Sequence, residues 1–187
     1  SIYGLMAIGF TLVFGIMHVI NLAHGELYML GAFSTFIMVG VYQLNFFAAI
    51  AAAMVIVGSL GFLIERYIFR PLRNTPMLNT LLASIGLSIF ISNLVLKIAG
   101  TGMRSIPSPF SEKNIEIFGA VISTHRLMVL LLTGLLVALL FWVIKFTKFG
   151  RSLRATSQDQ DASALMGVNI NLTYGIVFAI SAGMAAM

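Results

Sequence analysis

The chain has 187 residues, of which 59% are hydrophobic and only 9% are charged, and its mean hydropathy is +1.02. A soluble domain carries about one quarter charged residues, so this composition excludes an ordinary soluble protein and predicts a chain that needs lipid as its solvent. The net charge of +5 does not indicate nucleic-acid binding, because the basic residues lie mainly in short loops between apolar runs. The absence of cysteine excludes disulfides and thiolate chemistry.

The apolar runs are long and do not alternate with polar residues, so helices rather than a barrel must satisfy the backbone in lipid. The predicted fold class is all-α, a polytopic transmembrane bundle with a single domain over residues 1–187. A helix needs about 20 apolar residues to cross the hydrocarbon core. Six candidate spans follow, at roughly 1–20, 26–44, 46–64, 77–99, 127–146 and 170–187. Because the first and last lie within apolar runs at the chain ends, we expect a longer protein truncated at both ends.

Basic residues distinguish the two ends of the predicted bundle. Three lie in 66–73 and four in 145–154, together seven of the eleven in the chain. The positive-inside rule therefore places these two loops in the cytoplasm and the 100–126 connection outside, with odd spans running inward and even spans outward. The linker that starts at Glu65 contains two prolines and is expected to end the third span. Within 115–123 a weak hairpin pattern surrounds Phe118-Gly119, and we favour a short exposed cap there.

Polar residues crowd between the first two spans, in a stretch that contains Asn21, His24, Gly25 and Glu26. Ionisable groups at membrane depth are costly and persist where they line a cavity or pair with neighbours. If Gly25 breaks a helix here, the freed backbone groups could bind the charged ends of a small substrate. An interfacial turn is an equally weighted alternative, with Asn21 as the helix cap and Glu26 in the first helical turn.

Three serines of the fourth span recur every four residues, at Ser84, Ser88 and Ser92. Their shared face indicates either a translocation path or hydrogen bonds to another helix, and we favour the second. No arrangement in the sequence supports Ser84 and His24 as a nucleophile and base, so no catalytic residues are predicted. A metal site is not expected, because a third ligand is lacking near His24 and His125 falls on the opposite side of the membrane.

Glycines are frequent within the predicted spans, and Gly58 with Gly61 suits a close helix crossing. The run of small residues at 48–53 would suit a crossing equally well. These residues therefore indicate how helices approach one another rather than a chemical site.

Three stretches carry a family pattern: Gly9–Gly15 running into Asn21–Ala32, then Arg70–Arg73, and Gly150–Thr156 continuing to Leu165–Asn169. Together they resemble the branched-chain amino-acid permeases of ATP-binding-cassette importers, of the high-affinity leucine, isoleucine and valine type. The Asn-x-Ala-His-Gly-Glu run is the most specific, because it stands within apolar sequence. The resemblance covers nearly the whole chain.

The resemblance implies a non-catalytic, multi-pass permease subunit of a bacterial-type inner membrane, with no cofactor. It implies four kinds of partner besides lipid: a second permease subunit, two ATP-binding subunits, an external solute-binding protein and an amino-acid substrate. The chain itself has no P-loop for ATP. For such a permease the candidates for the substrate path are the polar residues Asn21, His24, Glu26, Ser84 and Ser88, together with Gly25 at the expected helix break.

In that family the cytoplasmic loop before a late span forms a short coupling helix that docks on the ATPase. Here Asp161-Ala162-Ser163 with Gly167 resembles the family's Glu-Ala-Ala-x-x-x-Gly motif, with Asp for Glu, Ser for the second Ala and no downstream proline. An ordinary solvated loop is the simpler interpretation of this segment, but we favour docking on the ATPase. The docking candidates are Gly150, Arg151, Arg154, Asp159, Asp161, Ala162, Ser163 and Gly167.

Two alternatives remain at the level of the sequence. A related importer permease for another solute, such as a sugar, would share the fold. A secondary transporter or channel component would need no ATPase and would depend on an ion gradient instead.

Overall fold

The computed structural model describes residues 2–100, 102, 114–117 and 120–187. Within them, all six predicted spans are helices. The elements in chain order are α1 (Ile2–Met17), α2 (His24–Gly40), α3 (Phe46–Ile64), η1 (Glu65–Phe69), α4 (Met77–Ala99), β1 (Asn114–Ile117), β2 (Ala120–Ser123), α5 (Thr124–Phe146), α6 (Lys148–Gln158), α7 (Gln160–Leu165) and α8 (Ile170–Ala185). The fold class is the predicted all-α bundle, with one short two-stranded hairpin attached.

Three of the described helices are long and apolar enough to cross a membrane, at Phe46–Phe69, Met77–Ala99 and Leu127–Phe146. The helices α1, α2 and α8 have 16, 17 and 16 residues. At 1.5 Å per residue these cover about 24–26 Å, against about 30 Å of hydrocarbon. The prediction of six helical segments is confirmed, although three of them are shorter than a full crossing.

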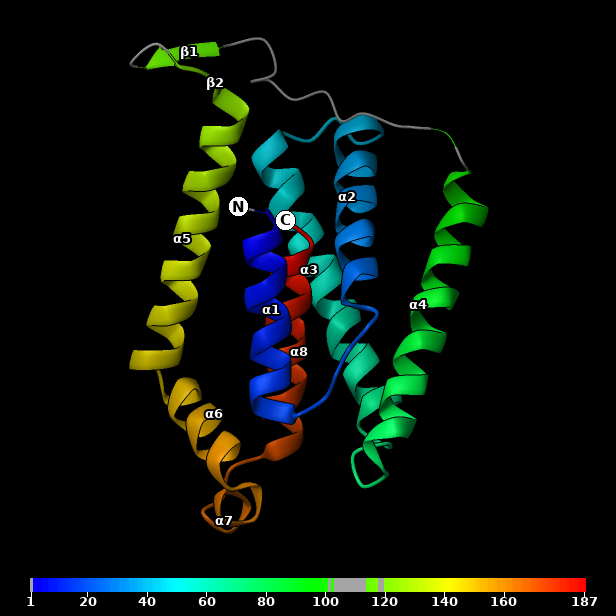
Figure 1. The fold of residues 1–187 in the computed structure, drawn as a ribbon, viewed down its shortest axis with the longest axis vertical. Helices are drawn as coiled ribbons and strands as arrows, with labels where there is room; N and C mark the ends of the chain where they lie inside the picture. Colours follow the sequence, from blue (N-terminus) through cyan, green and yellow to red (C-terminus); the bar gives the residue numbers. More distant parts are fainter. Residues whose placement is uncertain (1, 101, 103–113, 118–119) are drawn as a thin grey trace.

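Successive long helices alternate in direction, as the charge pattern predicted. The α3–α4 turn and the helices α6 and α7 lie at one end of the bundle, and the β1–β2 hairpin lies at the other (Figure 1). The two strands pair antiparallel, with Asn114 opposite Ser123 and Ile117 opposite Ala120. The preference for a simple cap over a hairpin was therefore wrong, because backbone pairing between the flanking residues outweighed a weak local pattern. Phe118 and Gly119 lie outside the described residues.

The centre of the bundle is the crossing of α3 and α8, where small residues let the two backbones approach closely. A Cβ added at Gly61 would lie 2.5 Å from the Ala182 Cβ, and one at Gly58 would lie 3.1 Å from the Ala179 carbonyl oxygen. In lipid, where helices gain little from burying apolar surface, such close approach is a main source of association. The predicted close crossing at Gly58 and Gly61 is confirmed, and its partner is α8.

The third span continues past Ile64 for one π-helical turn, η1. The prediction that the polar linker begins at Glu65 was wrong for this turn, because the side chains of Glu65 and Phe69 are buried against the bundle. These buried contacts stabilise a helical turn at residues whose polarity had suggested a loop. The chain turns only beyond Arg70.

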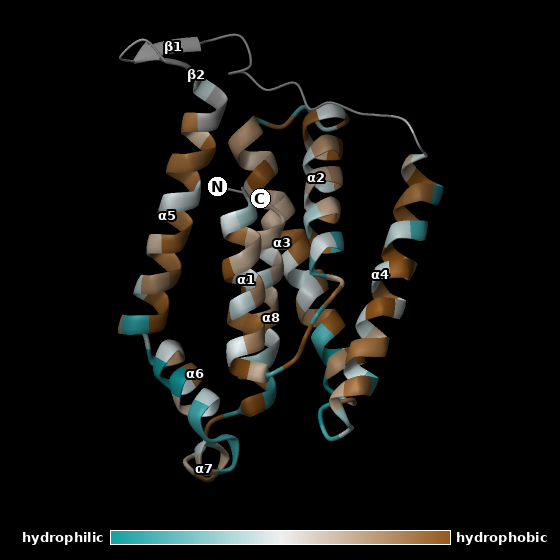
Figure 2. Ribbon diagram, in the orientation of Figure 1, coloured by the Kyte–Doolittle hydropathy of each residue, from teal (hydrophilic) through white to brown (hydrophobic). Residues whose placement is uncertain are grey.

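The helices α4 and α5 flank the bundle and bury few of their residues. Figure 2 shows hydrophobic residues along the length of both helices, whereas hydrophilic residues gather around α6 and the turn between α3 and α4. Leu82, Ile89, Leu131 and Leu135 are all more than half exposed. Apolar surface of this extent is stable only against lipid or another apolar chain, which agrees with a membrane bundle.

Candidate functional site

The connection from α1 to α2 runs back along the bundle instead of turning at its end. His18 adopts a positive φ of 53° directly after α1, and the chain then rises beside α1 until α2 begins at His24 (Figure 1). A Cβ placed on Gly9, in the middle of α1, would lie 3.2 Å from the His24 imidazole Nε2. The start of α2 therefore lies at the middle of the bundle.

This geometry partly corrects both interpretations of the Asn21–Glu26 stretch, the helix break at Gly25 and the interfacial turn capped by Asn21. The helix starts at His24 with Ala23 at the N-cap and no side-chain cap, so Asn21 does not cap α2 and Gly25 lies inside the helix. The break predicted at Gly25 lies just before it, in residues 18–23. Glu26 does occupy the first turn of α2, where a negative charge is favoured by the helix dipole.

Asn21 and His24 are buried polar side chains with unused hydrogen-bonding atoms. The Asn21 Oδ1 accepts a hydrogen bond from the Ala23 backbone N–H at 3.1 Å, whereas Asn21 Nδ2 and His24 Nε2 have no partner among the described residues. Their exposed fractions are only 2% and 5%. Most buried polar groups in proteins are paired, so unpaired atoms here indicate positions that a ligand or a rearrangement can satisfy.

Glu26 is joined to α4 by a hydrogen bond across the bundle. The Ser88 hydroxyl donates to Glu26 Oε1 at 2.9 Å. Ser88 is the central residue of the 23-residue helix α4, which places it about 16 Å from either end of the helix. The carboxyl group of Glu26 therefore lies beside the middle of a helix long enough to cross a membrane, and ionisable groups at such positions are rare and usually functional.

The remaining path candidates differ in their surroundings. Gly25 is exposed, with open space where a Cβ would point. Ser84 is fully buried, and its hydroxyl donates to the Leu81 carbonyl oxygen of its own helix at 2.7 Å. Of these two serines, Ser88 makes the predicted interhelical bond, to Glu26, whereas the hydroxyl of Ser84 bonds within α4.

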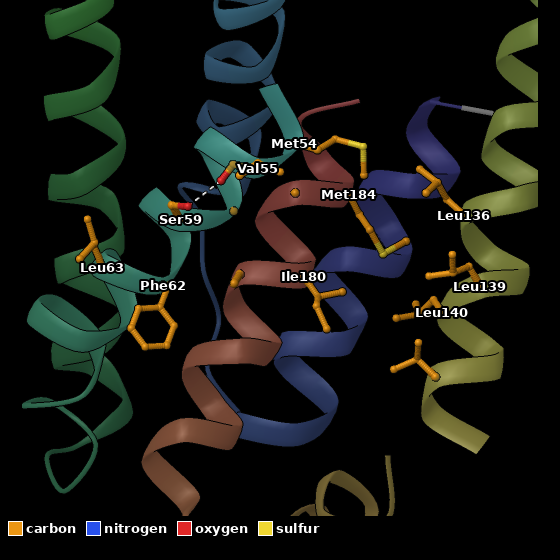
Figure 3. A pocket seen from close by; sticks show the side chains of 14 residues that line it. Met54, Val55, Ser59, Phe62, Leu63, Leu136, Leu139, Leu140, Ile180 and Met184 are labelled. Atoms are coloured by element: carbon orange, nitrogen blue, oxygen red, sulfur yellow. Dashed lines mark hydrogen bonds between the residues drawn. The ribbon is translucent and has the colours of Figure 1, made fainter. Parts of the chain in front are cut away.

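A cavity of about 720 Å³ opens between α3, α5 and α8, away from Glu26. Figure 3 shows Met54 and Phe62 of α3, Ile180 and Met184 of α8, and Leu136 of α5 around it. The lining is almost entirely apolar, so it offers no partner for the two charges of an amino acid. Size alone therefore does not make this cavity the substrate path.

The predicted docking segment folds into two short helices, α6 and α7, at the end of the bundle that carries the basic loops. Three of the docking candidates stabilise the arrangement of these two helices. The Asp159 Oδ1 accepts from the Ala162 N–H at 2.9 Å and caps α7, and the Arg154 guanidinium donates to the Ile144 carbonyl. A Cβ at Gly150 would overlap the Ile144 backbone.

The turn after α7 depends on glycine. Gly167 has φ of +86°, a conformation that side chains rarely adopt. The Gly167 N–H donates to the Ala164 carbonyl at 3.0 Å and the Val168 N–H donates to the Ser163 carbonyl at 3.0 Å, which closes the helix. Ser163 is buried, whereas Arg151, Asp161, Ala162 and Gly167 are exposed.

Sequence reasoning missed the most exposed apolar pair of this segment. Leu165 and Met166 are 88% and 87% exposed at the end of α7. Two large apolar side chains in an otherwise polar stretch, which begins at Ala155, were the signal that could have identified them. Exposed apolar groups outside the membrane commonly mark a protein interface.

Among the residues that the structure describes, no group of three or more His, Asp or Glu side chains is placed to hold a metal ion. The side chain of His125 lies outside the described part of the chain. His24 and Glu26 both lie in the first turn of α2, where an imidazole and a carboxyl group are available as hydrogen-bonding groups.

Comparison with known proteins gives consistent results. All 187 residues match the family described as branched-chain amino acid transport system, permease component. The chain is 35% identical over 199 residues to the high-affinity branched-chain amino acid transport system permease protein LivH of Escherichia coli K12, and covers 65% of it. LivH of Salmonella typhimurium LT2 gives the same identity and coverage.

A third relative, the high-affinity branched-chain amino acid transport system permease protein BraD of Pseudomonas aeruginosa, is 35% identical over 201 residues. All of this chain is matched in each comparison, and it spans 65% of the length of each relative. No solved structure matches the chain.

Proposed function

Because the chain belongs to the family of permease components of branched-chain amino acid transport systems, we propose that it forms the membrane path of an ATP-driven importer of leucine, isoleucine and valine. It is a multi-pass protein of a bacterial-type inner membrane and has no catalytic activity of its own. ATP is hydrolysed by two separate subunits, a second permease completes the path, and an external binding protein delivers the substrate.

The exposed pair Leu165 and Met166 is the observation that supports an ATP-coupled permease over a secondary transporter. A secondary transporter needs no partner at its cytoplasmic end, whereas an importer permease must transmit force from an ATPase. The two residues are 88% and 87% exposed, on a turn that backbone hydrogen bonds close. Burying two such side chains in a partner's groove supplies about 1.5–3 kcal/mol each, and the exposed Arg151 of α6 and Asp161 of α7 suit a partner surface of mixed charge.

The Glu26–Ser88 pair provides the polar group that a zwitterionic substrate needs at mid-depth. Its carboxylate is half-buried and matches the substrate ammonium in charge, while the unused Asn21 Nδ2 offers a donor to the carboxylate end. Transport then proceeds by alternating access, in which movement of α7 changes the side of the membrane to which Glu26 is open. If docking of the ATP-binding subunits at α7 changes the affinity for substrate at Glu26, then substrate must change the affinity for those subunits by the same factor.

Protection of a single cysteine tests the docking surface. Residues 1–187 contain no cysteine, so Met166→Cys introduces the sole thiol in this part of the protein. We expect a membrane-impermeant maleimide to label it rapidly in the permease alone and at least about tenfold more slowly once the ATP-binding subunits are bound, since a hot-spot side chain becomes desolvated in an interface. Asn74→Cys is the control, because Asn74 is exposed in the α3–α4 turn at the same end. Equal labelling of Met166→Cys with and without the subunits would contradict docking at this turn.

A further inference from the structure

Arg73 lies between α3 and α4 and is held on three sides. Its guanidinium forms a salt bridge with Glu65 of η1, and its Nη1 donates to the Asn171 side-chain oxygen at 2.9 Å. Its Cζ also stands 4.4 Å from the centre of the Tyr174 ring. A planar guanidinium is suited to such combined pairing and stacking, which a lysine does not reproduce.

The contacts of Arg73 are not an ordinary surface ion pair. The Glu65 side chain is only 2% exposed and that of Arg73 is 19% exposed. Breaking a buried pair leaves an uncompensated charge, so the two residues hold their positions firmly. Arg66, in the same basic cluster, has an exposed contact with the Tyr67 ring at 5.9 Å instead.

The two other contact residues of Arg73, Asn171 and Tyr174, lie at the start of α8, directly after the turn that follows α7. α8 begins at Ile170, and its N-cap Asn169 accepts from the Leu172 N–H at 3.1 Å. The preceding turn is closed by backbone bonds to α7, so α7 and the first turns of α8 are joined without a flexible linker. The Tyr174 hydroxyl also donates to the Ile16 carbonyl oxygen, at 3.4 Å, which ties this corner to the end of α1.

We infer that Arg73 is the positioning residue that transmits movement of the docking helix α7 to the membrane helices, by clasping Asn171 and Tyr174 of α8 to Glu65 at the end of α3. The inference rests on the proposed function and adds the route of its coupling. A displacement of α7 moves the first turn of α8, and the clasp carries that displacement to η1 and α3. Without the clasp, the first turn of α8 can shift relative to Glu65 and the α3–α4 turn, while the close crossing at Gly58 and Gly61 still holds α8 against α3.

The test compares ATP hydrolysis with substrate uptake in the reconstituted complete transporter. Arg73→Lys retains the charge and the pairing with Glu65 but loses the fork that reaches Asn171 and the flat face against Tyr174. We expect uptake per ATP hydrolysed to fall about tenfold, the order of effect of one charge-assisted hydrogen bond on an equilibrium, while hydrolysis continues. The matched control is Arg66→Lys, which we expect to behave as wild type.

A second variant keeps the test decisive if Arg73→Lys assembles poorly. Asn171→Ala removes one contact to α8 and leaves the Glu65–Arg73 salt bridge intact, and we expect it also to lower uptake per ATP. An unchanged ratio in both variants would overturn the clasp, as would a parallel loss of hydrolysis and uptake, which indicates only structural damage. A wild-type complex with no ATP-driven uptake would instead overturn the proposed function itself, and the clasp with it.

Discussion

Met166→Asp is expected to abolish ATP-driven uptake while the permease still folds. The side chain is 87% exposed in the isolated chain, so a carboxylate there costs the fold little. In a docked complex the same carboxylate would be buried without a partner, which costs several kcal/mol, in addition to about 2 kcal/mol for losing an apolar anchor. Uptake in proteoliposomes and co-purification of the ATP-binding subunits measure the effect.

The control for this variant is Gln160→Asp. It adds the same charge to an exposed position of the same short helix, where an acidic residue in the first turn is favourable. It should keep most of the uptake. If Met166→Asp also binds the ATP-binding subunits and transports normally, the turn after α7 is not the docking surface.

Glu26→Gln is expected to lower the uptake of leucine by about one to two orders of magnitude, without loss of the bundle. Glutamine has the shape of glutamate and still accepts the hydrogen bond from Ser88, so only the charge is removed. A hydrogen bond to a charged group contributes about 1.5–3 kcal/mol, which corresponds to that loss if the substrate ammonium pairs with Glu26. The quantity to measure is the rate of uptake against leucine concentration, at constant permease content.

Ser88→Ala provides the graded comparison for this variant. It removes a neutral donor and leaves the carboxylate charge, so the expected loss is about 1 kcal/mol or less. A Glu26→Gln permease with wild-type uptake would show that the carboxylate takes no part in the path. An effect of Ser88→Ala as large as that of Glu26→Gln would indicate a role in helix association instead.

Much of the fold could be predicted from local patterns, because membrane helices are specified by apolar length. The helices, their alternation and the cluster of basic residues at one end follow from composition and charge alone. The Gly58 and Gly61 crossing followed from residue size. The turn η1 could not be predicted, since the burial of Glu65 depends on its pairing with Arg73 and on the packing of Arg73 against α8, which is distant in sequence.

The candidate site shows the same division between local and tertiary information. The Asn21–Glu26 stretch stood out, because polar residues interrupt apolar sequence. The depth of this stretch within the bundle could not be predicted, because it depends on the segment that returns His24 to a position beside Gly9. The bond between Glu26 and Ser88 joins residues 62 apart, and only the assembled bundle selects Ser88 rather than Ser84. Exposure of Met166 likewise depends on the closed turn at Gly167.

Uptake of leucine into proteoliposomes is the most direct test of an ATP-coupled permease. The full-length protein should be reconstituted with its second permease, and the ATP-binding subunits, the external binding protein and ATP should then be omitted one at a time. We expect uptake only when all three are present, because the path must be opened through the docking segment. Uptake driven by an ion gradient alone would contradict ATP coupling and identify a secondary transporter.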